Sequence, residues 1–133
     1  MKNIPKKKET PKPKNMINWF EIPAANFERA VSFYDQIFQI KMETDKMNGY
    51  SMAFFPADQG ISGAIICGEG ANPSQNGALL YLNAGEDLNQ VLSKVEDAGG
   101  KVILGKQKIS KDGGFFALFI DSEGNKMALH STA

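Results

Sequence analysis

The sequence predicts an α+β fold made of two tandem βαβββ modules, whose curved mixed sheets surround a cavity with the helices on the convex side. The first observation behind this prediction is a strand–turn–helix pattern near residue 20 that returns near residue 80. The second is an internal match at offsets of 60 to 64 residues, which pairs Trp19 with Leu79 and Ala64 with Ala128. A slow drift in the offset is what small insertions in the turns of duplicated modules produce.

The first module is predicted to open with a strand over residues 16–22 and a helix over 26–39. Strand alternation puts Trp19 and Glu21 on one face and Phe20 and Ile22 on the other. Asn26 suits a helix N-cap, because its side-chain oxygen can accept a hydrogen bond from the first turn. The helix carries an apolar stripe that the Phe20 face would cover, formed by Phe27, Ala30, Val31, Tyr34, Ile37 and Phe38.

Three further strands complete the first module, over residues 41–44, 50–55 and 61–67. Asn48-Gly49 separates the first two and is a strong signal for a tight hairpin. Cys67, at the end of the third, is expected on the helix-facing side as an inert thiol.

The second module repeats this plan with a strand over residues 78–83 and a helix stripe from Leu88 to Ala98. Gly99-Gly100 should end that helix, since a glycine just past the last turn can adopt the left-handed conformation. The remaining strands are expected to begin at 101–104 and to cover 115–120 and 126–131. We therefore expect one domain over 15–131, with module one at 15–68, a linker at 69–77 and module two at 78–131.

The composition is that of one ordinary water-soluble domain of 133 residues, with 42% hydrophobic and 23% charged residues. One cysteine excludes an intrachain disulfide, and no apolar run is long enough to cross a membrane. The N-terminus lacks the apolar core of a secretion signal, so a cytoplasmic location is expected.

Residues 1–14 form a Lys/Pro-rich arm with six lysines and one glutamate, a net charge of +5 in a chain whose formal charge is zero. Such an arm buries too little apolar surface to order itself, so a disordered tail is expected. We expect no nucleic-acid partner beyond a weak contact through this arm, and no membrane partner.

The stretch from Asn18 to Tyr34, Asn-Trp-Phe-Glu-Ile-Pro-Ala-Ala-Asn-Phe-Glu-Arg-Ala-Val-Ser-Phe-Tyr, resembles the opening of the vicinal oxygen chelate superfamily of glyoxalases, bleomycin resistance proteins and extradiol dioxygenases. The resemblance covers about residues 15–131. It implies four metal-ligand positions, on the first and last strands of each module, where His, Glu or Gln would hold a divalent cation. Here these positions are occupied by Trp19, Ala64, Leu79 and Ala128, none of which can ligate a metal, so we expect no metal and no other cofactor.

The face that carries these positions is expected to be mainly apolar and aromatic, as small-molecule pockets usually are. The ligand-binding residues predicted on it are Trp19, Glu21, Ala64, Ile66, Leu79, Tyr81, Ala128 and His130. Glu21, if buried there, could act as an acid, a base or an anchor for a cation, or it could simply be paired. His130, the single histidine, is more typical of an ordinary satisfied imidazole than of a catalytic one. Trp19 and Tyr81 could contact a ligand or only fill space.

Three hypotheses for function follow. The leading one is a metal-free protein that binds a small, partly apolar molecule, similar to the bleomycin resistance branch, and forms a homodimer. The second is a lyase, isomerase or dioxygenase of the same superfamily, acting through Glu21 and His130 or through an unrecognised metal site. The third is an interaction domain whose sheet edges or paired modules bind another protein.

Overall fold

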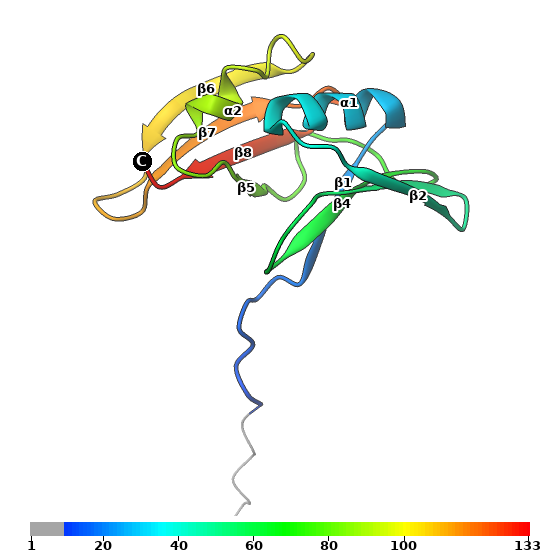
Figure 1. Cartoon of the computed structure of the whole chain (residues 1–133), viewed down its shortest axis with the longest axis horizontal. Helices are drawn as coiled ribbons and strands as arrows, with labels where there is room; N and C mark the ends of the chain where they lie inside the picture. Colours follow the sequence, from blue (N-terminus) through cyan, green and yellow to red (C-terminus); the bar gives the residue numbers. More distant parts are fainter. Residues whose placement is uncertain (1–9) are drawn as a thin grey trace, which may run out of the picture.

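The computed structural model describes residues 10–133 and contains two four-stranded sheets (Figure 1). The first module comprises β1 (Trp19–Pro23), α1 (Phe27–Phe38), β2 (Glu43–Met47), β3 (Tyr50–Phe54) and β4 (Ser62–Cys67). The second comprises β5 (Tyr81–Asn83), α2 (Asn89–Leu92), β6 (Lys101–Lys108), β7 (Phe115–Ile120) and β8 (Lys126–Ser131). Between them, residues 68–80 contain no helix or strand.

The two sheets have the same topology. Their strand orders are β1-β4-β3-β2 and β5-β8-β7-β6. In each sheet the first pair, β1 with β4 or β5 with β8, is parallel and the other pairs are antiparallel. The predicted α+β fold with two repeated modules is therefore confirmed.

The repeat extends to individual hydrogen bonds. The Ala24 N–H donates to the Ile66 carbonyl at 2.9 Å, and the Ala84 N–H donates to the His130 carbonyl at 2.8 Å. These two bonds are related by the same offsets, 60 and 64, that the sequence shows. The register agrees, because Glu21 lies beside Ala64 and Tyr81 lies beside Ala128.

Helix α1 has the predicted extent, and Asn26 is its N-cap, accepting from the Arg29 N–H at 3.0 Å. Its buried side chains are Ala30, Phe33, Tyr34 and Ile37. Phe33 was not in the predicted stripe. Its ring lies 6.0 Å from that of Phe119 in the second module, so α1 buries a second side against the other half of the chain.

The second helix is shorter than predicted, because regular α-helix covers only Asn89–Leu92 and residues 93–99 form turns. The Lys94 and Val95 N–H groups donate to carbonyls three residues back, the tighter pattern of a 3₁₀ turn. Leu88 and Val95 are nevertheless fully buried. The apolar spacing thus predicted which side chains are buried but not the backbone hydrogen bonds between them.

Several strand bounds also differ from prediction. Strand β5 begins at Tyr81, not at residue 78, and β2 covers Glu43–Met47 in place of 41–44. The β2 shift has a local cause, since the Met42 N–H donates to the Asp35 carboxylate at 2.9 Å and not to a neighbouring strand. The hairpin after β2 is confirmed, with positive φ at both Asn48 and Gly49.

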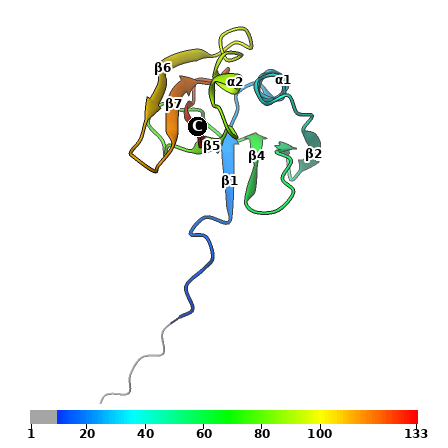
Figure 2. The same cartoon turned by 60° about the vertical axis from the view of Figure 1, so that its left-hand side comes forward.

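One continuous hydrophobic core joins the two modules, and α1 and α2 lie next to each other within it (Figures 1 and 2). Cys67 packs against this core as predicted. Gly100 allows a close approach to the first module, because a Cβ there would lie 2.7 Å from the Phe33 ring, and it would also lie 2.5 Å from the Ile120 carbonyl oxygen of its own module. A larger residue at position 100 would force these neighbours to shift.

The predicted disordered arm lies partly outside the described residues, which begin at residue 10. Residues 10–18 are exposed and lead away from the body of the domain (Figure 1). No helix in the described part of the chain is both long and apolar enough to span a membrane.

Candidate functional site

Each sheet exposes aromatic side chains on the face that points away from the helices. On the first sheet the Trp19 and Phe54 rings are 6.2 Å apart, and Trp19 is 45% exposed. On the second the Tyr81 and Phe116 rings are 6.3 Å apart, and Tyr81 is 53% exposed. Rings left open to water in this way can stack on a ligand or on a second protein surface.

The predicted ligand-binding residues fall into two groups, one on each sheet. The first sheet carries Trp19 and Glu21 on β1, with Ala64 and Ile66 on the adjacent β4. The second sheet carries Tyr81 on β5 and Ala128 and His130 on β8, while Leu79 lies just before β5.

The two catalytic candidates lie on different sheets. Glu21 is exposed on β1, and His130 is half-buried on β8 with its Nε2 2.8 Å from the Gly113 carbonyl oxygen. No hydrogen bond joins Glu21 to His130 within residues 10–133. An enzyme that works through this pair stays a prediction.

The residues at the four family metal positions do not fit a metal ion. Ala64 and Ala128 are completely buried in the middle of β4 and β8, and neither they nor Trp19 and Leu79 offer a lone pair for coordination. Among residues 10–133, no group of three or more His, Cys, Asp or Glu side chains is placed to hold a metal elsewhere.

Two cavities lie where the modules meet. The larger, of about 630 Å³, is on the helix side of β1, and its walls include Phe20, Phe38, Ile40, Phe55, Leu79 and Leu80. The smaller, of about 360 Å³, lies between β1 and β8 and includes Trp19, Glu21 and Lys126. Ala64, Ile66, Ala128 and His130 line neither of these two cavities.

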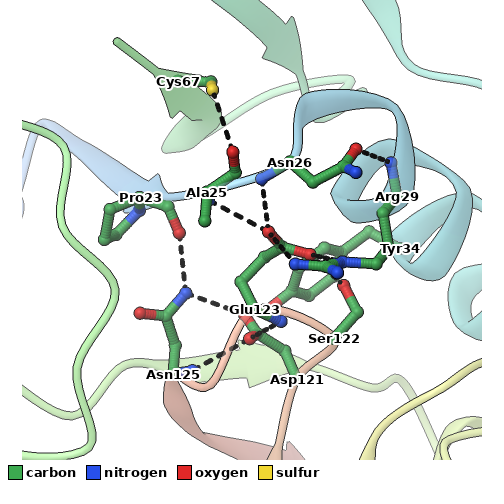
Figure 3. Close-up of polar contacts among 10 residues, drawn as sticks. All are labelled: Pro23, Ala25, Asn26, Arg29, Tyr34, Cys67, Asp121, Ser122, Glu123 and Asn125. Carbon is green, nitrogen blue, oxygen red and sulfur yellow. Dashed lines mark hydrogen bonds and ion pairs between the residues drawn. The ribbon is translucent and has the colours of Figure 1, made fainter. Parts of the chain in front are cut away.

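A polar network closes the junction between the turn at residues 121–125 and the first module (Figure 3). The Glu123 carboxylate, which has no exposed surface, accepts from the backbone N–H groups of Ala25 and Asn26 at 3.0 and 2.7 Å. It also accepts from Arg29 Nε at 2.8 Å. These donors lie at the N-terminus of α1, where the helix dipole favours a negative charge.

Asp121 and Asn125 extend this network into the core. Asp121 accepts from the buried Tyr34 hydroxyl at 2.7 Å and from the side-chain amide of Asn125 at 3.0 Å. The same amide of Asn125 donates to the Pro23 carbonyl at the end of β1, at 2.8 Å. Every buried side-chain polar atom in the described residues has a hydrogen-bond partner, as a stable buried network requires.

The network shifts the ionisation of two groups. Burial alone would raise the pKa of Glu123, but the hydrogen bonds from Arg29, Asn26 and Ser122 outweigh it, so this pKa lies below its ordinary value. Burial, together with the charge of Asp121, raises the pKa of Tyr34 well above its ordinary value. Glu123 therefore holds the modules together as a carboxylate at neutral pH.

The equivalent turn of the first module makes no such network. At the repeat offset of 64, Ala57, Gln59 and Ile61 stand where the second module has Asp121, Glu123 and Asn125. Within residues 10–133 no hydrogen bond joins the turn at residues 56–61 to the second module, and the 630 Å³ cavity lies there. Sequence reasoning missed this cavity, although a signal was available: the aligned turn has apolar Ala57 and Ile61 in place of Asp121 and Asn125, and uncharged Gln59 in place of Glu123.

The fold and these sites define a class of protein: a single domain of paired βαβββ modules with open aromatic faces. The sequence profile of the Glyoxalase/Bleomycin resistance protein/Dioxygenase superfamily matches residues 16–129. The chain therefore belongs to this superfamily, as the resemblance of its opening strand and helix implied.

Solved structures show the same fold at low sequence identity. A glyoxylase/bleomycin resistance protein/dioxygenase domain from Frankia sp. EAN1pec is 13% identical with a TM-score of 0.68, covering 91% of this chain and all of that one. A glyoxalase/bleomycin resistance protein from Albidiferax ferrireducens T118 is 16% identical with a TM-score of 0.63, covering 86% and 98%.

A glyoxalase I mutant from Zea mays is 19% identical with a TM-score of 0.67, covering 86% of this chain and 45% of that one. This chain thus spans about half the length of the maize protein. No curated protein sequence matches the chain.

Proposed function

We propose that this protein binds a small, partly apolar molecule without a metal ion, on the sheet faces that point away from the helices. The observation that carries the proposal is the replacement of all four family metal positions by Trp19, Ala64, Leu79 and Ala128 within an intact fold. The same faces expose the rings of Trp19 and Tyr81, which offer broad surfaces for stacking. Glu21, beside Ala64, could anchor a cationic group of the ligand.

We propose further that the protein works as a homodimer in the cytoplasm. The exposed Trp19 and Tyr81 faces belong to different sheets, and a second copy would bring one sheet of each chain together around a groove. Pairing would also cover apolar surface that is otherwise left in water. Sedimentation of the purified chain at tens of micromolar is expected to give a dimeric mass, and a monomeric mass would contradict this part of the proposal.

The test begins with purified full-length protein, dialysed without chelator. Elemental analysis is expected to find no stoichiometric divalent metal, since the four positions offer no lone pairs. A thermal-shift screen of small molecules then selects ligands, because a compound that binds only the folded state raises its melting temperature.

Trp19 provides the second half of the test, because it is the only tryptophan of the chain. Its emission should change as a selected ligand binds. Trp19→Ala should weaken binding about ten-fold, or about 1.4 kcal/mol, through loss of stacking, while the Trp19→Phe control should retain most of the affinity. One equivalent of bound metal would contradict the proposal. So would a ligand that binds the Trp19→Ala variant with the same affinity as the wild type.

A further inference from the structure

The 630 Å³ cavity is a concave space between the two modules, on the opposite side of the first sheet from the exposed Trp19. Its walls come from β1, the end of α1, the turn at residues 56–61 and the segment that leads into β5. Its volume is within the range of known small-molecule sites. It is distinct from the Trp19 face of the proposed function, although it shares Leu79 and Tyr81 with the residues assigned there on the second module.

The cavity exists because the junction around residues 56–61 is not filled. The equivalent junction of the second module is bridged by Asp121, Glu123 and Asn125, which bond to α1 and to the end of β1, and of the two cavities only the smaller, of about 360 Å³, lies there. In the first module Ala57 is too small to reach across, and Ile61 remains 38% exposed. Covering the exposed parts of these apolar walls with an apolar ligand is favourable, because it removes them from water.

The residues that line the cavity indicate which class of ligand would fit it. No Asp, Glu, Lys, Arg or His lines the cavity, so a charged group would lose its hydration without compensation. Three phenylalanine rings, those of Phe20, Phe38 and Phe55, favour a planar apolar body.

Two polar groups stand at the β5 edge of the cavity. The Tyr81 hydroxyl makes no hydrogen bond within residues 10–133. Asn83 uses its amide oxygen to accept from the Gly85 N–H at 2.9 Å, which leaves its amide nitrogen able to donate. A ligand with one or two hydrogen-bonding atoms at one end would match this arrangement.

We infer that this cavity is a second binding site, for an uncharged, largely planar apolar molecule whose polar end faces Tyr81 and Asn83. The probe for the test is N-phenyl-1-naphthylamine, an uncharged two-ring compound whose fluorescence rises in apolar surroundings. Added to the full chain, it should saturate one site per chain with a Kd below about 0.2 mM, a value typical for a ligand of its size. Intermolecular NOEs should connect its rings to the methyl groups of Ile40, Ile61 and Leu80.

Two matched variants test the location. Ile61→Glu places a carboxylate at the edge of the cavity and should weaken probe binding about ten-fold or more. Ile103→Glu makes the same change on β6, at a side chain 46% exposed and outside the cavity lining, and should leave binding unchanged. Ala57→Trp, which places a large side chain in the cavity wall, should weaken binding without adding a charge. Heteronuclear NMR spectra of each variant verify that it is folded.

The inference is overturned if the probe shows no saturable binding, or if its NOEs go to Met52 and Leu118 on the opposite faces of the sheets. Equal effects of Ile61→Glu and Ile103→Glu would also contradict it. Because the NOEs identify the side of the sheet that is occupied, failure here is distinguishable from failure of the Trp19-centred proposal. Failure of the Trp19 test would likewise leave this cavity unaffected.

Discussion

The turns that precede the last strand of each module are related by the internal repeat, yet among the described residues only one of them forms hydrogen bonds to the other module. The turn at 121–125 brings Asp121, Glu123 and Asn125 against the start of α1 and the end of β1. The turn at residues 56–61 carries Ala57, Gln59 and Ile61 at the equivalent positions and leaves the larger cavity. One junction therefore holds the modules together, while the other remains open to a ligand.

The helices explain why the two turns could diverge. Tyr34 of α1 needs a buried acceptor for its hydroxyl, and Asp121 supplies it at 2.7 Å. At the repeat offset of 61 the second module has Val95, which is buried but has no polar atom to satisfy. The second module thus has no hydroxyl that needs a buried acceptor, and Ala57, the repeat equivalent of Asp121, lies exposed.

The largest effect is expected at Asp121. Asp121→Ala would leave the Tyr34 hydroxyl and the N–H groups of Glu123 and Asn125 without their acceptor, at a cost of about 3 kcal/mol in the free energy of unfolding. The matched control is Asp58→Ala in the exposed open turn, expected to cost less than about 0.5 kcal/mol. Urea unfolding measures both, and equal losses would show that the two turns contribute alike.

Glu123→Gln should have the next largest effect, about 2 kcal/mol at neutral pH, because it removes a buried charge that Arg29 and the α1 N-terminus stabilise. The pKa of Glu123 is lowered in the folded protein, so this stabilisation is complete above the ordinary pKa of 4.5. It is lost as the pH falls through the lower folded pKa.

Unfolding measured from pH 7 downward should therefore show the wild type and the Glu123→Gln variant converging in stability as the pH falls below 4.5, the ordinary pKa of a glutamate. Gln59→Glu, the reverse change in the open turn, should produce no comparable gain at pH 7. A constant gap between wild type and the Glu123→Gln variant across this range would show that the carboxylate charge is not what matters.

Tyr34→Phe should have the smallest effect of the three, about 1 kcal/mol, since Asp121 keeps the donors of Asn125 and Glu123. The pKa of Tyr34 is raised in the folded state, so one of the three tyrosines should ionise only on unfolding at high pH. Ultraviolet absorbance should detect this late step in the wild type and not in the Tyr34→Phe variant. A normal alkaline titration of all three tyrosines would contradict the buried contact with Asp121.

The sequence alone determined the duplicated βαβββ fold, since strand alternation, the helical stripe of α1 and the repeat offsets are local properties of the chain. It also led to the prediction that the four family metal positions carry no ligands, because that prediction needs only residue identities at aligned positions. The α1 cap at Asn26 and the hairpin at Asn48-Gly49 were predictable for the same reason, as each depends on a few adjacent residues.

Only the tertiary structure decided how the two modules face each other. The contacts between the modules join residues some 90 positions apart in the chain: Phe33 with Phe119, Tyr34 with Asp121, and Arg29 with Glu123. No periodicity in the sequence indicates such pairs. The length of α2 was likewise decided by packing, which buried the predicted stripe in tighter turns than a regular helix. The larger cavity is the clearest case, because it forms where residues of the two modules come together without filling the space between them. The sequence of each wall by itself has the pattern of an ordinary apolar core.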